Sequence, residues 1–450
     1  MKTKLRKIAA ISFLASAGVA FVLTGCIGFH KSRGNPQGSG AFATGHYRNL
    51  FAENGHSQKE IRAKADSAFQ QLFHGNSTSQ TIYYSAGSNS NGPLAYITDI
   101  KHNDVRTEGL SYGMIICAEL DKQAEFNALW NWSLQYLYHS DPGDPGYGFF
   151  AWQARTNGDR MSQGIAPDGE EYYTMALYFA AGRWGSGKGI YNYKAEADQL
   201  LSRMRHRAVI TGASPRLPNG RGGGQVTAGP LFDETNRMVL FVPEYGRGQF
   251  FTDPSYHLPA FYELWARWGP AEDHDFWLGA AQNSRDYFAK VAHPVTGLTP
   301  HDSSFDGSLR GGGRGGGGFG GFGGGPRFEY DAFRTAGNWS VDWSWWAKDP
   351  RERELSDKLQ AFFESKGMTN YGCQFTLDGT QTLDARHAQG LVAVNAEASL
   401  AATDSARAKE FVEALWNTPT PDGLERYYEG LLYMMALLHD SGEFRVWAPH

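Results

Sequence analysis

Residues 424–440, with the sequence LERYYEGLLYMMALLHD, show most clearly the pattern from which the fold is predicted. Apolar side chains recur every three or four positions, which places them on one side of an α-helix. Gly442 follows the end of the pattern, as helix-terminating residues do. The segment therefore predicts a helix with one apolar side. That side consists of Leu424, Tyr427, Tyr428, Leu431, Leu432, Met435 and Leu438.

The same periodicity recurs upstream along the chain. Ser57 and Glu60 form a capping-box pattern, and apolar residues follow at helical spacing from Ile61 to Leu72. Strand signals are few and short, such as residues 81–84. We therefore predict an all-α fold of about twelve helices, arranged as a closed ring of helix pairs with a site in the loops at one end. The other predicted helices cover about 109–121, 124–138, 170–184, 192–206, 256–268, 274–291, 334–347, 351–365, 388–403 and 405–416.

Composition narrows the function classes. The formal net charge is −5 over 450 residues, without a basic stripe that would indicate nucleic-acid binding or an acidic block that would indicate a disordered tail. Aromatic residues make up 14% of the chain. They indicate either a large helical core or a cleft with flat platforms on which sugar rings stack.

The first residues predict export. A basic stretch precedes a short apolar run, and the run ends in Leu23-Thr24-Gly25-Cys26, which resembles a bacterial lipobox. We interpret residues 1–26 as a lipoprotein signal peptide with Cys26 as the lipidated residue; an ordinary cleaved signal is the alternative. Ile and Gly at positions 27 and 28 favour the outer membrane. The basic residues are Lys2, Lys4, Arg6 and Lys7.

Behind the signal, residues 27–44 are expected to form a flexible tether, and 45–450 a single domain. Within that domain, residues 311–325 are nearly all glycine and predict a mobile surface loop, because they offer little apolar surface to bury. An RNA-binding reading of this run is weak, since it contains one arginine. Cys117 and Cys373 leave one disulfide open. We expect no metal site and no cofactor, because Cys and His do not cluster at ligand spacing.

Three carboxylates stand at predicted helix starts: Glu108, Asp168 and Asp331. On a helical ring they would converge over one end. Gly109 would let a ligand approach the backbone beside Glu108, and a buried Glu there could act as a general acid. The alternative is structural, since acidic residues stabilise first turns and Asp168 with Glu171 matches a capping box. Inverting glycosidases place an acid and a base about 6.5–9.5 Å apart.

Four segments together resemble glycoside hydrolase family 8, and the resemblance extends over most of the chain, nearest to its reducing-end xylose-releasing exo-oligoxylanases. It implies an (α/α)6 barrel and inverting cleavage of β-1,4-linked xylo-oligosaccharides. It also implies that Glu108 is the general acid, that Asp331 is the general base, and that Asp168 holds the distorted central sugar. The segments are DVRTEG at 104–109, APDGEEY at 166–172, DPSYHLP at 253–259 and RYY at 426–428.

The resemblance also assigns substrate contacts. His387 matches the histidine of a loop that closes the cleft at the reducing-end sugar, although Ala388 replaces the proline that usually follows. Tyr256 matches a second contact to that sugar. Ordinary packing is the alternative for both, and the altered loop leaves exo-action open. The glycine-rich run before Asp331, where relatives have a shorter loop, is the other departure.

Three further residues are candidates for substrate binding. Trp152 resembles an aromatic that stacks on a sugar near the cleavage point. Arg106 is expected to hydrogen-bond near Glu108, and Arg334 to orient Asp331 by a bidentate pair; a structural salt bridge is the alternative for either arginine.

Two alternatives remain at this stage. One is another activity of the same family: an endo-xylanase, a β-1,4-glucanase or a chitosanase. The other is a surface lipoprotein that binds glycans without cleaving them. The second would need the aromatic platforms but not all three carboxylates.

Overall fold

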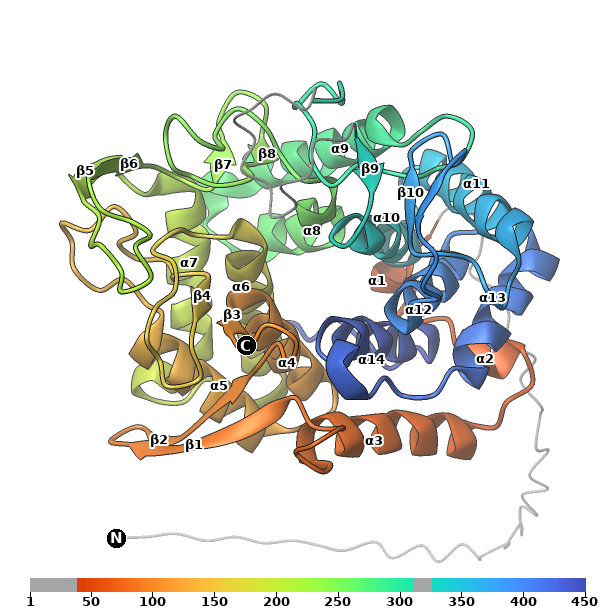
Figure 1. Cartoon of the computed structure of the whole chain (residues 1–450), viewed down its shortest axis with the longest axis horizontal. Helices are drawn as coiled ribbons and strands as arrows, with labels where there is room; N and C mark the ends of the chain where they lie inside the picture. Colours follow the sequence, from red (N-terminus) through yellow and green to blue (C-terminus); the bar gives the residue numbers. More distant parts are fainter. Residues whose placement is uncertain (1–38, 311–325) are drawn as a thin grey trace, which may run out of the picture. The chain divides into compact units, whose positions relative to one another are not determined.

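The computed structural model describes residues 39–310 and 326–450, which all belong to one compact unit. Inner and outer helices alternate along the chain and around a ring (Figure 1). The ring closes where α14 contacts α4, so the predicted (α/α)6 barrel is confirmed. The inner helices are α4 (Thr107–Glu119), α6 (Pro167–Trp184), α8 (Pro259–Trp268), α10 (Ala332–Trp346), α12 (Gln389–Glu397) and α14 (Tyr428–Asp440). The outer helices are α3 (Gln58–His74), α5 (Gln123–Tyr136), α7 (Tyr193–His206), α9 (His274–Val291), α11 (Arg351–Lys366) and α13 (Ser405–Asn417).

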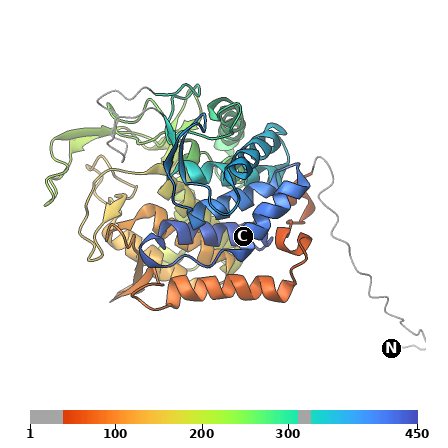
Figure 2. The ribbon, with the colours of Figure 1, turned by 45° about the vertical axis from the view of Figure 1, so that its right-hand side comes forward.

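Burial separates the two rings. Inner helices such as α4 and α6 are buried on nearly every side, which requires small and apolar residues all around the helix. Outer helices bury one face: α13 buries only Phe411, Val412 and Leu415. The predicted capping box of α3 is present, with Ser57 and Glu60 bonded reciprocally. Figure 2 shows α3 along the outer edge of the ring.

Helix boundaries differ from the sequence prediction where 3-10 turns intervene. The helix predicted from 256 begins only at Pro259, after the turn η2 (Pro254–Tyr256), and the one predicted from 424 begins after η5 (Gly423–Glu425). The one predicted to reach 403 ends at Glu397, before η4 (Ala398–Leu400). The other two 3-10 turns are η1 (Gly189–Tyr191) and η3 (Ala271–Asp273).

The folded part begins earlier than expected. The short helix α1 (Ala41–Thr44) falls inside the predicted tether, yet Ala41 is fully buried. The ring of Phe42 lies 4.4 Å from that of Trp346, and a Cβ at Gly40 would overlap the backbone of α10. Packing therefore fixes the chain at least from Gly40, and the tether boundary at 44 is wrong by several residues. A second short helix, α2, spans Leu50–Glu53.

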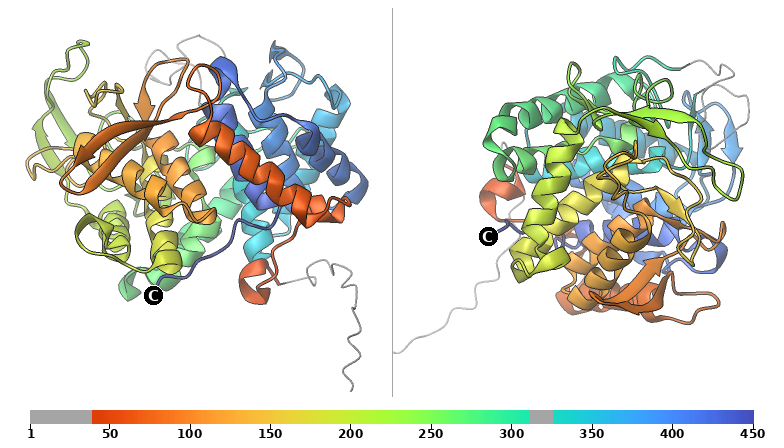
Figure 3. Two further views of the ribbon diagram at one scale, coloured as in Figure 1. Left: turned by 90° about the horizontal axis from the view of Figure 1, so that it is seen from below. Right: turned by 90° about the vertical axis from the view of Figure 1, so that its left-hand side faces the viewer.

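Short antiparallel strands decorate the ring, and Figure 3 shows the β1–β2 hairpin in orange on the same side as α3. The pairs are β1 (Tyr83–Asn89) with β2 (Gly92–Ile97), β3 (Val105–Arg106) with β4 (Gln153–Ala154), β5 (Ile210–Ala213) with β6 (Gln225–Ala228), and β7 (Phe232–Asp233) with β8 (Met238–Val239). A three-stranded sheet has the order β11 (Thr382–Asp384), β10 (Gln374–Thr376), β9 (Arg327–Phe328).

Cys117 and Cys373 are buried free thiols, so the disulfide left open by the sequence does not form. The predicted signal, Cys26 and the glycine-rich run 311–325 lie outside the described residues. No helix in the described part of the chain combines the length and apolarity that a membrane crossing requires.

Candidate active site

The three predicted carboxylates meet at one end of the ring, each at the start of an inner helix. Glu108 is the second residue of α4, Asp168 is the second residue of α6, and Asp331 occupies the N-cap position of α10. Because helix N-termini carry partial positive charge, this end of the ring is suited to carboxylates. The convergence expected from the sequence is therefore present.

Arg334, one turn into α10, joins the three carboxylates. Its Nη1 donates to Asp168 Oδ2 at 2.8 Å and to Glu108 Oε2 at 3.3 Å. Its Nη2 lies 3.5 Å from Asp331 Oδ1. Because one guanidinium group makes these contacts, the nearest oxygens of Glu108 and Asp331 are within about 9 Å of each other, which is compatible with the spacing of about 6.5–9.5 Å in inverting glycosidases.

The predicted bidentate pair between Arg334 and Asp331 is not present. Only one nitrogen of Arg334 faces Asp331, because the other is shared by Glu108, Asp168 and the Tyr112 hydroxyl. The buried guanidinium therefore contacts all three carboxylates rather than one partner.

Glu108, whose side chain is 14% exposed, lies beside a tyrosine. The Tyr427 hydroxyl donates to its Oε1 at 3.3 Å. A Cβ at Gly109 would lie 2.5 Å from the Tyr427 ring, so the glycine admits this ring rather than a ligand. Burial raises the pKa of Glu108 to about 7; the positive charge of Arg334 lowers the pKa, and the negative charges of Asp168 and Asp331 raise it further.

Asp168 lies deeper than Glu108. Its side chain is 6% exposed, and its Oδ1 accepts from the backbone nitrogen of Gly169 at 3.0 Å. The expected capping role is wrong, because α6 starts earlier, at Pro167. A Cβ at Gly169 would lie 2.5 Å from Thr107 Oγ1, so this glycine lets the starts of α6 and α4 approach closely. Burial raises the pKa of Asp168, while Arg334 lowers it.

Asp331 differs from the other two carboxylates in its exposure. Its side chain is 41% exposed, against 14% for Glu108. The preceding Tyr330 has a positive φ of 43°, a left-handed conformation that is uncommon for a tyrosine. Its carbonyl accepts from the Tyr428 hydroxyl at 2.9 Å. This strained turn leaves Asp331 open to solvent.

Asp253 is a fourth carboxylate of the cluster, and the sequence analysis did not assign it to the site. It is 1% exposed, and its Oδ1 accepts from the nitrogen of Ser255, whose hydroxyl accepts from Arg334 Nη2 at 2.9 Å. Its Oδ2 is buried without a hydrogen-bond partner among the described residues. Burial, and then the charge of Asp331, raise its pKa well above the usual range. The signal was its place in the DPSYHLP segment, where it caps the 3-10 turn η2 that precedes α8.

Arg106 and Trp152 lie beside this cluster. Arg106 forms ion pairs with Asp99 and Asp104, both at 3.0 Å, so its structural alternative is present. Its guanidinium lies 5.9 Å from the Trp152 ring centre. The Trp152 carbonyl accepts from the nitrogen of Thr107, the residue before Glu108. The predicted aromatic platform is thus bound to the strand that leads into α4.

Tyr256 belongs to the cluster, whereas His387 stands apart from it. Tyr256 is buried with its ring centre 5.8 Å from the Arg334 guanidinium, and the charges of Asp168, Asp253 and Asp331 all act on it.

His387 Nδ1 donates to the Tyr371 carbonyl at 2.9 Å, which leaves Nε2 for another partner. Glu429 accepts from the Gln389 nitrogen at 2.7 Å and forms an ion pair with Arg386. Glu429 therefore anchors the loop despite Ala388.

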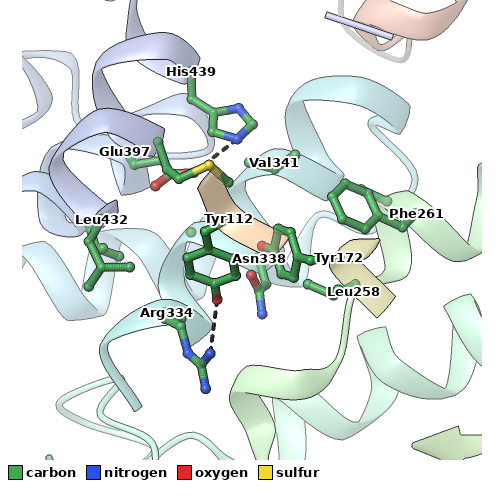
Figure 4. A pocket seen from close by; sticks show the side chains of 14 residues that line it. Tyr112, Tyr172, Leu258, Phe261, Arg334, Asn338, Val341, Glu397, Leu432 and His439 are labelled. Atoms are coloured by element: carbon green, nitrogen blue, oxygen red, sulfur yellow. Dashed lines mark hydrogen bonds and ion pairs between the residues drawn. The ribbon is translucent and has the colours of Figure 1, made fainter. Parts of the chain in front are cut away.

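A small cavity of about 40 Å³ lies inside the ring, next to Arg334 (Figure 4). Tyr112, which accepts from Arg334, lines it, and at its other end Glu397 lies 3.7 Å from His439. A water needs about 10–15 Å³ of such space. The cavity thus has room for a few waters but not for a sugar, which must enter from the side of the carboxylates.

Comparison with known proteins gives a consistent result. The sequence model of glycosyl hydrolases family 8 matches residues 69–230. A reducing-end xylose-releasing exo-oligoxylanase of Paenibacillus barcinonensis is 39% identical over 92% of this chain and 100% of the relative. A second exo-oligoxylanase, from Halalkalibacterium halodurans, is 38% identical over 91% of this chain and 97% of the relative.

Among solved structures, a catalytic mutant of a family 8 xylanase from Teredinibacter turnerae, in complex with xylohexaose, matches with a TM-score of 0.85. It is 49% identical and covers 91% of this chain and 100% of that one. A reducing-end xylose-releasing exo-oligoxylanase matches with a TM-score of 0.79 at 40% identity, over 92% and 100% of the two chains.

Proposed function

The chain belongs to glycosyl hydrolase family 8, and we propose that it is an inverting glycoside hydrolase that releases xylose from the reducing end of β-1,4-linked xylo-oligosaccharides. The single observation that carries the mechanism is the Arg334 junction, which gathers Glu108, Asp168 and Asp331 at one end of the barrel. Exo-oligoxylanases 34–39% identical over most of the chain support the substrate.

Glu108 acts as the general acid. Burial keeps its carboxyl group protonated up to a pH of about 7, so it has a proton to give to the glycosidic oxygen as the bond breaks. The Tyr427 hydroxyl and Arg334 hold its two oxygens in place before the transfer and stabilise the carboxylate that remains afterwards.

Asp331 acts as the general base. Its open side chain can bind a water, remove one proton from it and direct the oxygen to the anomeric carbon from the face opposite the leaving group. One displacement of this kind converts the β-linkage to an α-hemiacetal. Asp168, held by Arg334 and the Gly169 nitrogen, positions the sugar between the two groups.

Product analysis on xylotriose tests this function directly. Xylose and xylobiose in equal amounts, with slow cleavage when the reducing end is converted to the alditol, is the expected result. Equal rates on native and end-reduced xylotriose would contradict exo-action, and no hydrolysis of either substrate would contradict the whole function.

An endo-acting xylanase is the second candidate. The 49%-identical xylanase crystallised with xylohexaose favours it, and so does His387, whose hydrogen bond in the described part of the chain goes to the Tyr371 carbonyl rather than to the carboxylate cluster. A ladder of mid-sized products from long xylan would identify this activity.

We further propose that the enzyme is exported and anchored by a lipid on Cys26, facing the periplasm from the outer membrane. The basic start, the short apolar run and Leu23-Thr24-Gly25-Cys26 support this. Wild-type protein should incorporate labelled palmitate and sediment with membranes, whereas Cys26→Ser should do neither. Membrane association that survives the substitution would contradict the anchor.

A further inference from the structure

A second, larger hollow lies beyond Trp152. This rim cleft has a volume of about 290 Å³ and is lined by Gln163, Gly164, Ser214, Arg221, Glu244 and Arg247 among others. It lies between the residues that lead into α6 and the β5–β6 hairpin, which stands at the left of Figure 1 and projects, in yellow-green, in Figure 3. Its size is near the lower end of the range of about 300–1,000 Å³ for small-molecule sites.

One glycine joins the rim cleft to the aromatic platform. The Trp152 nitrogen donates to the Gly164 carbonyl at 2.9 Å. A Cβ at Gly164 would lie 3.1 Å from Glu244 Oε1 and 3.8 Å from Trp152 Cδ1, so this glycine lets Glu244 and Trp152 lie close to the same point of the chain. A ligand bound at Trp152 is therefore next to the rim cleft.

The rim cleft carries two exposed arginines. Arg221 and Arg247 are exposed, and neither side chain has a hydrogen bond or ion pair with another described residue. Of the two acidic residues in the lining, Asp144 is already bound to His139 at 3.0 Å and to the Gly146 nitrogen at 2.7 Å. Both carboxylate oxygens of Asp144 are thus already hydrogen-bonded.

Glu244 supplies one carboxylate oxygen that has no hydrogen-bond partner in the described part of the chain. It is 7% exposed; its Oε1 accepts weakly from the Ile165 nitrogen at 3.4 Å, and its Oε2 has no hydrogen-bond partner among the described residues. Burial raises its pKa, while the positive charges of Arg247 and Arg207 lower it. A buried polar atom left unpaired costs free energy that a ligand hydroxyl can recover.

From this arrangement we propose that the rim cleft binds a uronic-acid side branch of an acidic xylo-oligosaccharide, with Arg221 and Arg247 binding its carboxylate. Planar guanidinium groups match a carboxylate in shape and charge. The volume suits one branch sugar, with Glu244 as a partner for its hydroxyls. The inference rests on the proposed function. If only one xylose fits on the reducing-end side of the cleaved bond, a branch pocket must bind a branch on a sugar on the non-reducing side of that bond.

The test measures binding by calorimetry in the full-length Glu108→Gln protein, which keeps the ligand intact. The ligands are linear xylotetraose, the same chain with one uronic-acid branch on an internal sugar, and the methyl ester of that branched chain. We expect the acidic branched ligand to bind about tenfold more tightly than the linear one. The advantage should shrink in high salt and disappear with the ester, because the charge is screened or removed.

Adding Arg221→Gln and Arg247→Gln should remove this advantage. Adding Arg216→Gln, at an exposed arginine of the same hairpin outside the cleft lining, should leave the advantage in place. Equal affinity for the branched and linear ligands, an ester that binds as tightly as the acid, or an advantage that survives the double substitution would each overturn the proposal. Hydrolysis of linear xylotriose by the wild type tests the proposed function separately.

Discussion

The starts of α4 and α10 carry the two proposed catalytic carboxylates in opposite environments. Glu108 is 14% exposed and its pKa is raised to about 7, whereas Asp331 is 41% exposed and touches Arg334 through one nitrogen. The acid needs a proton at neutral pH, which burial preserves, and the base needs a water molecule, which exposure admits. Their different burial thus suits the two carboxylates to the different roles that we propose.

The largest expected effect comes from removing the buried acid. Glu108→Gln should lower kcat on xylotriose by about 10²–10⁴-fold while leaving the fold intact, because the leaving oxygen loses its proton donor. A xylobiosyl fluoride, whose leaving group needs no proton, should be cleaved with a much smaller loss. Kinetics on both substrates make the measurement, and near-normal turnover of xylotriose would remove Glu108 from this role.

Asp331→Asn should cause a loss of similar size, about 10²–10⁴-fold, for the opposite reason. Without a base to activate water, the fluoride should be cleaved as poorly as xylotriose. If the fluoride rescued Asp331→Asn as it rescues Glu108→Gln, the two sites would not differ in role. Circular dichroism of both variants controls for folding.

Arg334→Gln should destabilise the protein by about 3–5 kcal/mol, because buried carboxylates lose their counter-charge. Denaturant unfolding measures this. Arg106→Gln is the control, since the Arg106 side chain is 25% exposed against 3% for Arg334, and its loss should cost less. Where Arg334→Gln folds, the alkaline limb of kcat/KM should move to higher pH, because Arg334 lowers the pKa of Glu108. An alkaline limb at the same pH as in the wild type would show that Arg334 does not lower the pKa of Glu108.

The pH dependence follows from the same burial. Since Glu108 must be protonated, kcat/KM should fall about tenfold per unit above its pKa of about 7. Because the pKa of Glu108 is higher in the folded protein than in the unfolded chain, the contribution of this group to folding stability is complete below the pKa of the unfolded chain. The contribution is progressively lost as the pH rises through about 7. Glu108→Gln should therefore flatten the decline of stability with pH. A rate that stays constant to pH 9 would contradict the assignment.

The smallest expected effect is on chain-end preference. His387→Ala should lower the rate on xylotriose relative to the rate on longer chains by about tenfold or less. The substitution removes the imidazole Nε2 that we expect to hydrogen-bond to the reducing-end hydroxyl. Tyr371→Phe, which keeps the carbonyl that binds His387, serves as the control. An unchanged ratio would place the source of exo-action elsewhere.

The sequence predicted the barrel well because each helix carries its own period and ends, as residues 428–440 and 57–60 show. It also placed three carboxylates at helix starts, and the closed ring then brings these starts together. What it could not supply were contacts between distant segments. The approach of Tyr427 over Gly109 and the sharing of Arg334 among three helices depend on tertiary packing, which no local pattern encodes.

Asp253 and the rim cleft show the same limit. Asp253 stood in a quoted segment, yet its importance follows from burial next to Asp331, which is known only from the fold. Arg221, Glu244 and Arg247 lie in segments without periodicity, and only the hairpin brings them to one hollow. The start of the folded part was misjudged because Ala41 is fixed by α10, about 300 residues away.

Proton NMR of the first products from a β-linked xylo-oligosaccharide tests the division of roles between the two carboxylates most directly. We expect the α-anomer to appear first at the newly formed end and then to mutarotate, because Asp331 activates one water for a single displacement. Initial formation of the β-anomer would mean two displacements and a covalent intermediate, and would contradict the assignment of Asp331 as a base.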